Sequence, residues 1–240
     1  TPPTAASSGA DLNGKATQEA CKMLKQRLLT FASQYLKTKP NDLNFRDSHL
    51  YNGNTKTELS WHQLINKAFE HRVDLSANGY YATPNIHFDP GNNKGEPFAY
   101  HVYGTAATEV TVDILLGRYV VDRVAVVHDF GQSFSPLIDL GQAEGALVQG
   151  IGWMTLEDVC FNDQGKLLSD TLSTYKIPDI HCAPKSLEIS FLEGSDNPMG
   201  VFKSKAIGEP PFIYGIGTFM AIRKALRSAC PNKDIPFIAP

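Results

Sequence analysis

One carboxylate, Glu209, stands on a stiff turn directly ahead of an apolar stretch, residues 213–229. Two prolines follow it, so the backbone has few conformations, and a residue before proline is biased away from the α region. Because proline is tolerated in the first turn of a helix, we predict that Glu209 lies at or just before a helix start. A carboxylate held in this way loses little freedom when it acts as a general base.

The neighbours of Glu209 in the sequence would also strengthen it as a base. They are apolar: Ile207, Phe212 and Ile213. If they enclose the carboxylate, the loss of water disfavours its charged form and makes it a better proton acceptor. We therefore predict an enclosed carboxylate.

A structural role for Glu209 is the competing interpretation. The dipole of a helix favours a carboxylate at the helix N-terminus whatever the function. A second Gly-Glu-Pro, at Gly95-Glu96-Pro97, follows a polar turn and precedes a strand-like run. We predict a solvated loop there, so the tripeptide alone does not indicate catalysis.

Two further polar residues, Gln142 and Glu144, begin a predicted helix that is rich in glycine and alanine. Small neighbours allow a helix to press against a bulky group, and the carboxamide of Gln142 can both donate and accept hydrogen bonds. The pattern is about equally compatible with a ligand-binding helix and with a tightly packed helix that has one polar anchor.

The opening segment, residues 4–9, has the chemistry of an anion-binding loop. Small side chains let backbone N–H groups approach a phosphate, and the hydroxyls of Ser7 and Ser8 add donors. A disordered terminus is the alternative. The first ten residues are not a natural initiation sequence, so we expect a piece of a longer chain.

The composition argues against several classes of protein. The 22 basic and 25 acidic residues give a net charge of -3 without a basic stripe, which argues against nucleic-acid binding. The apolar runs are too short to span a bilayer and no signal peptide opens the chain, so we expect a cytoplasmic protein. No Gly-x-Ser-x-Gly motif supports a serine hydrolase.

Metal ligands are also not indicated by the residue spacing. The seven histidines form no ligand set, and His128-Asp129 is interpreted as a satisfied core pair. The four cysteines are scattered along the chain, and we predict that they are buried thiols of a reducing compartment. They are Cys21, Cys160, Cys182 and Cys230.

Helices and strands are predicted without a regular βαβ repeat, so the expected fold class is α+β. Helical spacing covers residues 13–37, 61–71 (capped by Ser60) and 137–156, and the residues after Glu209. Strand patterns cover residues 73–83, 98–116, 119–128 and 187–192, with hairpin turns at 117–118 and within 156–168. The polar stretch 41–58 is predicted to be a loop.

Five segments in order carry a resemblance to a known family. They are PTAAS at 3–7, SANGYYATPN at 76–85, DLGQAEGALVQG at 139–150, STYKIP at 173–178 and SKAIGEPP at 204–211. This series resembles the xanthine dehydrogenase family of molybdenum hydroxylases, in the C-terminal part of the molybdopterin-binding region. The likeness extends from residue 4 to about residue 229. It implies that residues 1–240 are a fragment of that region, with 41–58 as an insertion.

The resemblance implies a reaction and a base. Glu209 would be the general base in the hydroxylation of an electron-poor carbon beside a ring nitrogen, which takes hypoxanthine and xanthine toward urate in purine catabolism. Lys205 would orient the turn that carries Glu209 or tune its electrostatic field.

The resemblance also implies which residues meet the molybdopterin cofactor. Ala5 and Ala6 would line the space of the molybdenum and the substrate, and Ser7 and Ser8 would lie against the pterin. Gln142 would lie near the oxygen or sulfur ligands of the metal. No protein side chain is expected to ligate the metal.

Further parts of the enzyme are expected outside this chain. They are the preceding half of the molybdopterin-binding region and the domains or subunits that bind [2Fe–2S] clusters and FAD, in an enzyme expected to be a dimer. We expect the isolated fragment to be inactive and free of cofactor, with an apolar cut face.

Other functions remain open at this stage. An aldehyde oxidase or another N-heterocycle hydroxylase shares the Gly-Glu-Pro-Pro turn. A non-catalytic assembly module would use Glu209 as a helix cap. A hydrolase with Glu209 and Glu144 as paired carboxylates would need the two groups close together.

Overall fold

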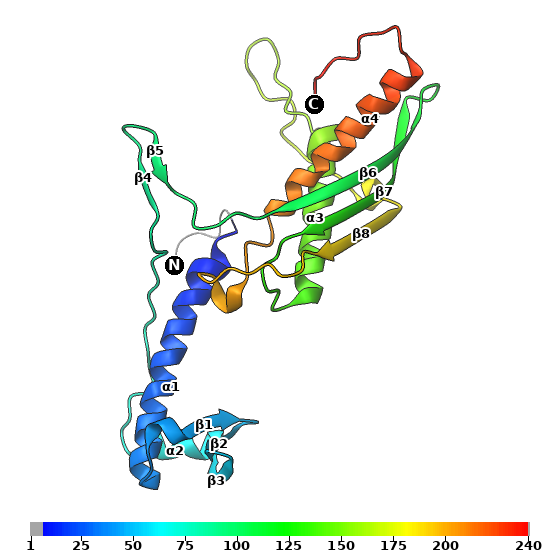
Figure 1. Ribbon diagram of the computed structural model, residues 1–240. Coiled ribbons are helices and arrows are strands. Elements are labelled where there is room, and N and C mark those ends of the chain that lie inside the picture. The colour runs from blue at the N-terminus through cyan, green and yellow to red at the C-terminus, as the bar shows by residue number, and fades with distance from the viewer. Residues whose placement is uncertain (1–6, 240) are drawn as a thin grey trace. The chain divides into compact units, whose positions relative to one another are not determined.

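The computed structural model describes residues 7–239, which form two units. The first unit comprises residues 12–84, and the second comprises residues 85–239 together with residues 7–11. Helices are combined with two antiparallel sheets and one mixed sheet, without a repeating strand–helix order (Figure 1). The predicted α+β class is confirmed.

The first unit packs helices against a small antiparallel sheet of order β1-β2-β3. Its elements are α1 (Lys15–Leu36), β1 (Leu43–Arg46), β2 (His49–Asn52), β3 (Thr55–Ser60) and α2 (Trp61–Glu70). The Ser60 hydroxyl accepts a hydrogen bond from the Gln63 N–H, and the Gln63 carboxamide accepts one from the Ser60 N–H. This capping box confirms the predicted start of α2.

The prediction of a loop at residues 41–58 is wrong, because these residues form most of the sheet. Each strand has one buried residue, a leucine: Leu43, Leu50 and Leu59. With a single core residue in each short strand, the composition stays polar even though the backbone is paired. Alternation over so few residues gives almost no signal in the sequence.

The prediction of a strand at residues 73–83 is also wrong, because that segment is irregular. The guanidinium of Arg27 donates hydrogen bonds to the carbonyls of Asp74 and Ser76 and forms an ion pair with the Asp74 carboxylate. A side chain from α1 therefore occupies carbonyls that a neighbouring strand would otherwise bind.

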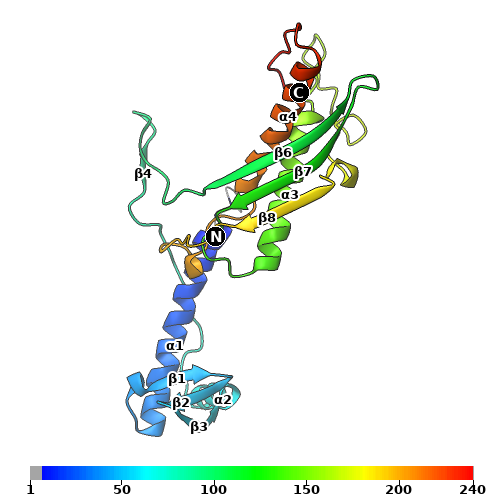
Figure 2. The ribbon, with the colours of Figure 1, turned by 45° about the vertical axis from the view of Figure 1, so that its right-hand side comes forward.

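The second unit is built on a mixed sheet of order β6-β7-β8. Its elements are β4 (His87–Asp89), β5 (Lys94–Glu96), β6 (Gly104–Asp113), β7 (Arg118–His128), α3 (Pro136–Thr155), β8 (Ser186–Phe191) and α4 (Ile216–Ala229). β7 pairs antiparallel with β6 and parallel with β8. α3 and α4 cover the same face of this sheet, as the two views agree (Figures 1 and 2).

The core of this unit lies between that sheet face and the two helices. It is formed by Val121, Val124, Val126, Leu147 and Ile151. A register shift in the β6–β7 pair lets both Val121 and Val124 face inward, although they are three residues apart. The predicted hairpin turn at 117–118 and the predicted helix at 137–156 are confirmed.

The predicted hairpin within 156–168 is present only in part. Phe161 and Leu167 form a single bridge, and the side chain of Asn162 accepts the N–H groups of Gln164 and Lys166. The turn is therefore stabilised locally by one side chain, as is common for asparagine.

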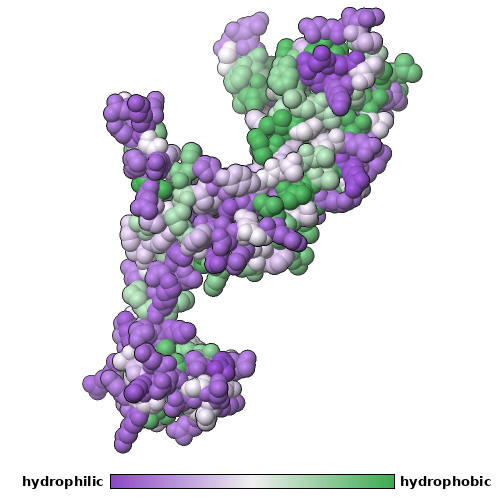
Figure 3. Space-filling model, viewed as in Figure 1, coloured by the Kyte–Doolittle hydropathy of each residue, from purple (hydrophilic) through white to green (hydrophobic). Residues whose placement is uncertain are grey.

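The surfaces of the two units differ in polarity. The unit that contains β1–β3 is largely hydrophilic, whereas the second unit shows larger hydrophobic areas (Figure 3). None of the helices within residues 7–239 combines the length and the apolar character that crossing a bilayer requires.

Candidate functional site

The Glu209 turn, residues 204–211, runs into a 3₁₀ helix at Pro210–Gly215 and then into α4. The predicted helix after Glu209 is confirmed. The Glu209 backbone, however, lies in the α region, at φ -92° and ψ -38°. The Phe212 N–H donates to the Glu209 carbonyl at 3.1 Å. This is the first hydrogen bond of the 3₁₀ helix, and the helical backbone at Glu209 departs from the extended conformation that a following proline favours.

The Glu209 side chain is exposed and makes no capping hydrogen bond. The predicted enclosure is wrong for the described residues, since Ile213 is itself 56% exposed. Phe212 turns toward α3 and packs on Trp153, with ring centroids 5.2 Å apart. The carboxylate is therefore open to solvent here, and its geometry gives no support to a capping role.

Contacts from distant parts of the chain hold the backbone of the turn. The Lys205 N–H donates to the Phe130 carbonyl at 3.0 Å. The Ala206 N–H donates to the Tyr100 hydroxyl, and the Glu209 N–H donates to the Ser7 hydroxyl, both at 2.9 Å. The acceptors lie up to 202 residues away from their donors. The direction of the Glu209 turn is thus fixed by tertiary contacts at three successive points.

A buried ion pair anchors the start of the turn. Lys205 Nζ lies 2.5 Å from Asp129 Oδ2, and the two side chains are 8% and 0% exposed. Asp129 also accepts hydrogen bonds from the Ser195 hydroxyl and the Gly131 N–H. Burial raises the pKa of Asp129, but the bonds from Lys205, Ser195 and Gly131 outweigh it and hold the pKa below its usual range. The charge of Lys205 is therefore compensated by a buried carboxylate at the start of the turn.

Tyr100 links the turn to a second carboxylate, Asp11. The Tyr100 hydroxyl donates to Asp11 Oδ2 at 2.6 Å while it accepts the Ala206 N–H. Burial raises the pKa of Asp11, and the hydrogen bond from Tyr100 lowers it by less. Burial, and then Asp11 itself, raise the pKa of Tyr100. Sequence reasoning missed both residues, since neither belongs to a motif and 89 residues separate them.

Ser7, Gln142 and the Glu209 turn meet at Gly208. A Cβ atom on Gly208 would lie 3.4 Å from Gln142 Oε1 and 3.5 Å from Ser7 Oγ. The structure therefore brings together three residues that were selected from separate motifs: Ser7, Gln142 and Glu209. Ser8 is half-buried beside Ser7, whereas Ala5 and Ala6 lie outside the described residues.

The first half of α3 offers an open, small-residue surface around Gln142. Cβ atoms at Gly141 and Gly145 would meet no atom within 4 Å. Nearby on the helix, Leu137 and Ile138 are 83% and 62% exposed. This surface has room for a bulky group beside the carboxamide, with few side chains to obstruct it.

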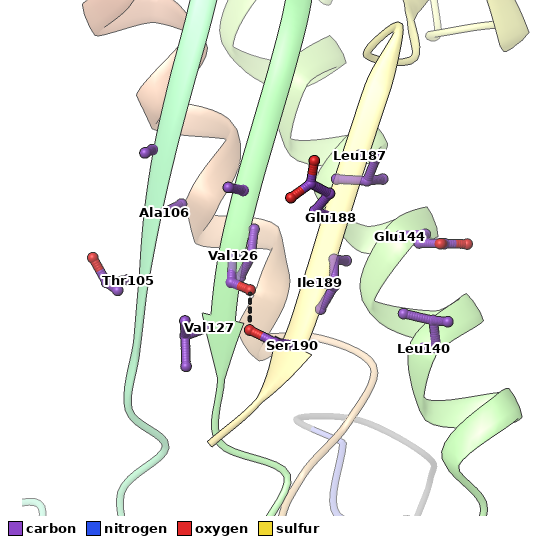
Figure 4. A pocket seen from close by; sticks show the side chains of 12 residues that line it. Thr105, Ala106, Val126, Val127, Leu140, Glu144, Leu187, Glu188, Ile189 and Ser190 are labelled. Atoms are coloured by element: carbon purple, nitrogen blue, oxygen red, sulfur yellow. Dashed lines mark hydrogen bonds between the residues drawn. The ribbon is translucent and has the colours of Figure 1, made fainter. Parts of the chain in front are cut away.

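A separate cavity of about 620 Å³ is lined by all three strands of the β6-β7-β8 sheet and by Leu140 and Glu144 of α3 (Figure 4). Ser190 bonds the Val126 carbonyl in its wall. Ser7, Gln142 and Glu209 do not line it. Because residues two apart on a helix point to different sides, Glu144 faces this cavity and not the Glu209 turn. A paired-carboxylate hydrolase therefore has no support.

Metal-binding side chains and thiols give no alternative site. Within residues 7–239, no three histidine, cysteine, aspartate or glutamate residues are grouped so that they could hold a metal ion. The prediction of buried thiols is wrong: Cys21 and Cys160 are exposed, and Cys182 and Cys230 are half-buried. Burial was inferred from the scattered spacing of the cysteines, which says nothing about which side of an element each one faces; Cys21, for example, lies on an exposed position of α1.

Residues 1–184 match the family described as "Molybdopterin cofactor-binding domain". The chain belongs to this molybdopterin-binding family. It is 39% identical over 229 residues to the xanthine dehydrogenase/oxidase of Mus musculus, which covers 95% of this chain and 16% of the mouse protein. It is also 39% identical over 232 residues to the xanthine dehydrogenase of Dictyostelium discoideum, with the same coverage. The chain thus spans 16% of the length of these curated relatives.

The fold of this molybdopterin-binding chain is also found in solved structures. The quinoline 2-oxidoreductase of Pseudomonas putida 86 matches it with a TM-score of 0.72 at 23% identity. The match covers 95% of this chain and 28% of that one. At this identity the likeness establishes the fold.

Proposed function

We propose that this chain is the C-terminal molybdopterin-binding part of a xanthine dehydrogenase-like molybdenum hydroxylase, with Glu209 as the general base. The proposed reaction takes hypoxanthine and xanthine toward urate by hydroxylation at carbon. The identity to xanthine dehydrogenases along almost the whole chain supports this substrate class. The convergence of Ser7, Gln142 and the Glu209 turn at Gly208 is the observation that carries the proposal.

The described residues fit the cofactor by chemistry and by space. Gln142 offers a donor and an acceptor on a helix face where Gly141 and Gly145 leave open room. Gly208 has no side chain at the point where Ser7 and Gln142 meet. We propose that Gln142 and Ser7, with Ser8, Ala5 and Ala6, hold the molybdopterin group. That group supplies the redox chemistry of the hydroxylation when it is bound.

The protein's own part in this reaction is placement and proton transfer. The Lys205–Asp129 pair and the three backbone hydrogen bonds fix the Glu209 turn. Glu209 Oε then takes one proton as the substrate is hydroxylated, and a positioned carboxylate of this kind contributes roughly two to four orders of magnitude in rate. Because the carboxylate is exposed in this chain, we propose that the surface excluding water belongs to the preceding half of the region.

The rest of the enzyme is part of the proposal. Curated relatives are about six times longer than this chain, as the 16% coverage implies. We propose that the missing length supplies the first half of the cofactor pocket, the purine contacts, the iron–sulfur clusters and the flavin, in a cytoplasmic dimer.

The test is a matched pair of substitutions in the full-length enzyme. Glu209→Gln should lower xanthine turnover per molybdenum by at least about 100-fold, because the base is lost while the shape is kept. Glu96→Gln, in the second Gly-Glu-Pro, should leave turnover within about twofold of the wild type. Equal turnover of both variants would contradict the role of Glu209 and favour a structural module.

The substrate class is tested in the same preparations. Xanthine and an aromatic aldehyde are assayed side by side, each over a range of concentrations. A higher kcat/KM for xanthine supports the purine assignment, whereas a higher kcat/KM for the aldehyde would replace it with aldehyde oxidation.

A further inference from the structure

A buried hydrogen bond joins the helix that follows Glu209 to the end of strand β7. His128 Nδ1 lies 2.6 Å from the Tyr214 hydroxyl, and His128 is 0% exposed. The two rings meet edge to face, with centroids 5.6 Å apart. Tyr214 belongs to the 3₁₀ helix Pro210–Gly215, which begins immediately after Glu209.

The backbone around this bond leaves a fitted space for the hydroxyl. Gly104 is paired with His128 across β6 and β7. A Cβ atom on Gly104 would lie 1.7 Å from the Tyr214 hydroxyl oxygen. Since no contact that short exists between real atoms, the tyrosine can reach His128 only because position 104 is glycine.

The same 3₁₀ helix also touches α3. A Cβ on Gly215 would lie 2.1 Å from the Gly150 carbonyl carbon, and one on Gly150 would lie 2.1 Å from the Phe212 oxygen. The backbones therefore touch directly. The 3₁₀ helix is thus held both by its contact with α3 and by the His128 bond.

His128 is suited to a fixed, uncharged role. Burial lowers its pKa to about 4, and the neighbouring Asp129 only partly opposes this shift. His128 and Asp129 both lie in the core, as predicted, and they do not orient one another: Asp129 bonds Lys205 and His128 bonds Tyr214. The imidazole is therefore uncharged at neutral pH, and its hydrogen bond to Tyr214 is not altered by protonation there.

We propose that His128 and Tyr214 are positioning residues for Glu209, an inference that rests on the proposed function. Tyr214 lies on the 3₁₀ helix whose first hydrogen bond is accepted by the Glu209 carbonyl. Fixing the Tyr214 hydroxyl fixes the rotation of that helix about its axis. The direction in which the Glu209 carboxylate leaves the turn is set at the same time. Small errors in such placement are costly, since a displacement of about 1 Å can lower a rate by about 100-fold.

The first test removes one hydroxyl in the full-length enzyme. Tyr214→Phe should lower kcat by about tenfold and leave KM within about twofold, because orientation and not binding is impaired. Hydrogen exchange at residues 212–216 should become faster, while molybdenum content stays the same. Tyr119→Phe is the control, since Tyr119 packs on the same core without a role at the turn. It should leave both kcat and the hydrogen exchange of these residues unchanged.

A second test separates the hydrogen bond from simple filling of space. The amide of asparagine can reach the position of Nδ1, whereas that of glutamine reaches the position of Nε2. His128→Asn should therefore retain more of the kcat than His128→Gln, although glutamine fills more of the buried volume. The reverse order would assign His128 to packing and overturn the inference.

The outcomes distinguish this inference from the proposed function. If Glu209→Gln abolishes turnover but Tyr214→Phe leaves kcat within twofold, the positioning role is refuted and the base stands. If Glu209→Gln leaves turnover unchanged, the proposed function fails and the positioning role fails with it.

Discussion

Two turns with the same tripeptide, Gly-Glu-Pro, differ in almost every structural respect. Gly95 and Glu96 lie in β5 of the β4–β5 hairpin, in which every strand residue is exposed. The predicted solvation of Glu96 is confirmed, although its backbone is a strand and not a loop. The Glu209 turn is held by Ser7, Tyr100, Phe130 and a buried ion pair. The local sequence places a carboxylate in both tripeptides. Tertiary contacts fix the backbone direction only at the Glu209 turn.

The largest predicted difference between the two turns is in stability. Lys205→Met should destabilise the folded protein by about 3–5 kcal/mol, because Asp129 is then buried without its ion-pair partner. Lys94→Met, beside the exposed tripeptide, should change stability by less than about 0.5 kcal/mol. Thermal unfolding of the full-length enzyme compares them. The double variant Lys205→Met/Asp129→Leu should recover part of the loss, and no recovery would contradict the ion-pair explanation.

A methyl group added at Gly208 should lower turnover and leave the fold intact, whereas one added at Gly95 should disturb the local fold and leave turnover intact. Gly208→Ala meets Gln142 and Ser7 only at ordinary contact distances, so the fold should persist. Turnover should still fall by about tenfold, because the methyl group enters the space proposed for the cofactor. Gly95→Ala would meet the His87 carbonyl at 2.4 Å with φ at +153°, so it should disrupt the hairpin locally without lowering turnover. Turnover per molybdenum and hydrogen exchange of residues 87–96 are measured together. Full activity of Gly208→Ala would place the cofactor elsewhere.

A smaller effect is expected from the Ser7 hydroxyl. Ser7→Ala removes the acceptor of the Glu209 N–H and should cost about 1 kcal/mol, together with a several-fold loss of kcat. Ser7→Asn is the matched variant, because its carboxamide offers an acceptor and asparagine tolerates the φ of 52° at this position, and it should retain more of the kcat. Steady-state kinetics of both variants decide between a hydrogen-bonding role and a purely spatial role.

The smallest effect concerns pH, and the two regions should respond with opposite signs. The pKa of Asp11 is raised from 3.8, mainly by burial, so its contribution to stability is present below pH 3.8 and is lost as pH rises through its folded pKa. The pKa of Asp89 in the hairpin is lowered by bonds from Asn92 and Gly91, so its contribution is present above pH 3.8 and is lost as pH falls through its folded pKa. Asp11→Asn should therefore stabilise the protein slightly at neutral pH, and Asp89→Asn should not. Melting curves between pH 3 and pH 7 measure both. A destabilised Asp11→Asn at neutral pH would show that the Tyr100 bond outweighs burial.

Some features of this protein were determined by the sequence itself. The apolar spacing of α1, α3 and α4, the Ser60 cap and the β6–β7 hairpin are local patterns, and local patterns are readable because neighbouring residues create them. The order of five short motifs was enough to predict the molybdopterin-binding family. Those same motifs supplied Ser7, Gln142 and Glu209, the residues that meet at Gly208.

Tertiary structure decided what those residues can do. The backbone of Glu209 is helical although a proline follows it, and its side chain is exposed while Phe212 packs on Trp153. The Asp11–Tyr100 and His128–Tyr214 bonds join residues 89 and 86 positions apart. A sequence contains no trace of such pairs, because each partner is ordinary by itself. These hydrogen bonds become necessary only in the folded protein, because burial removes water and makes an unpaired polar group costly.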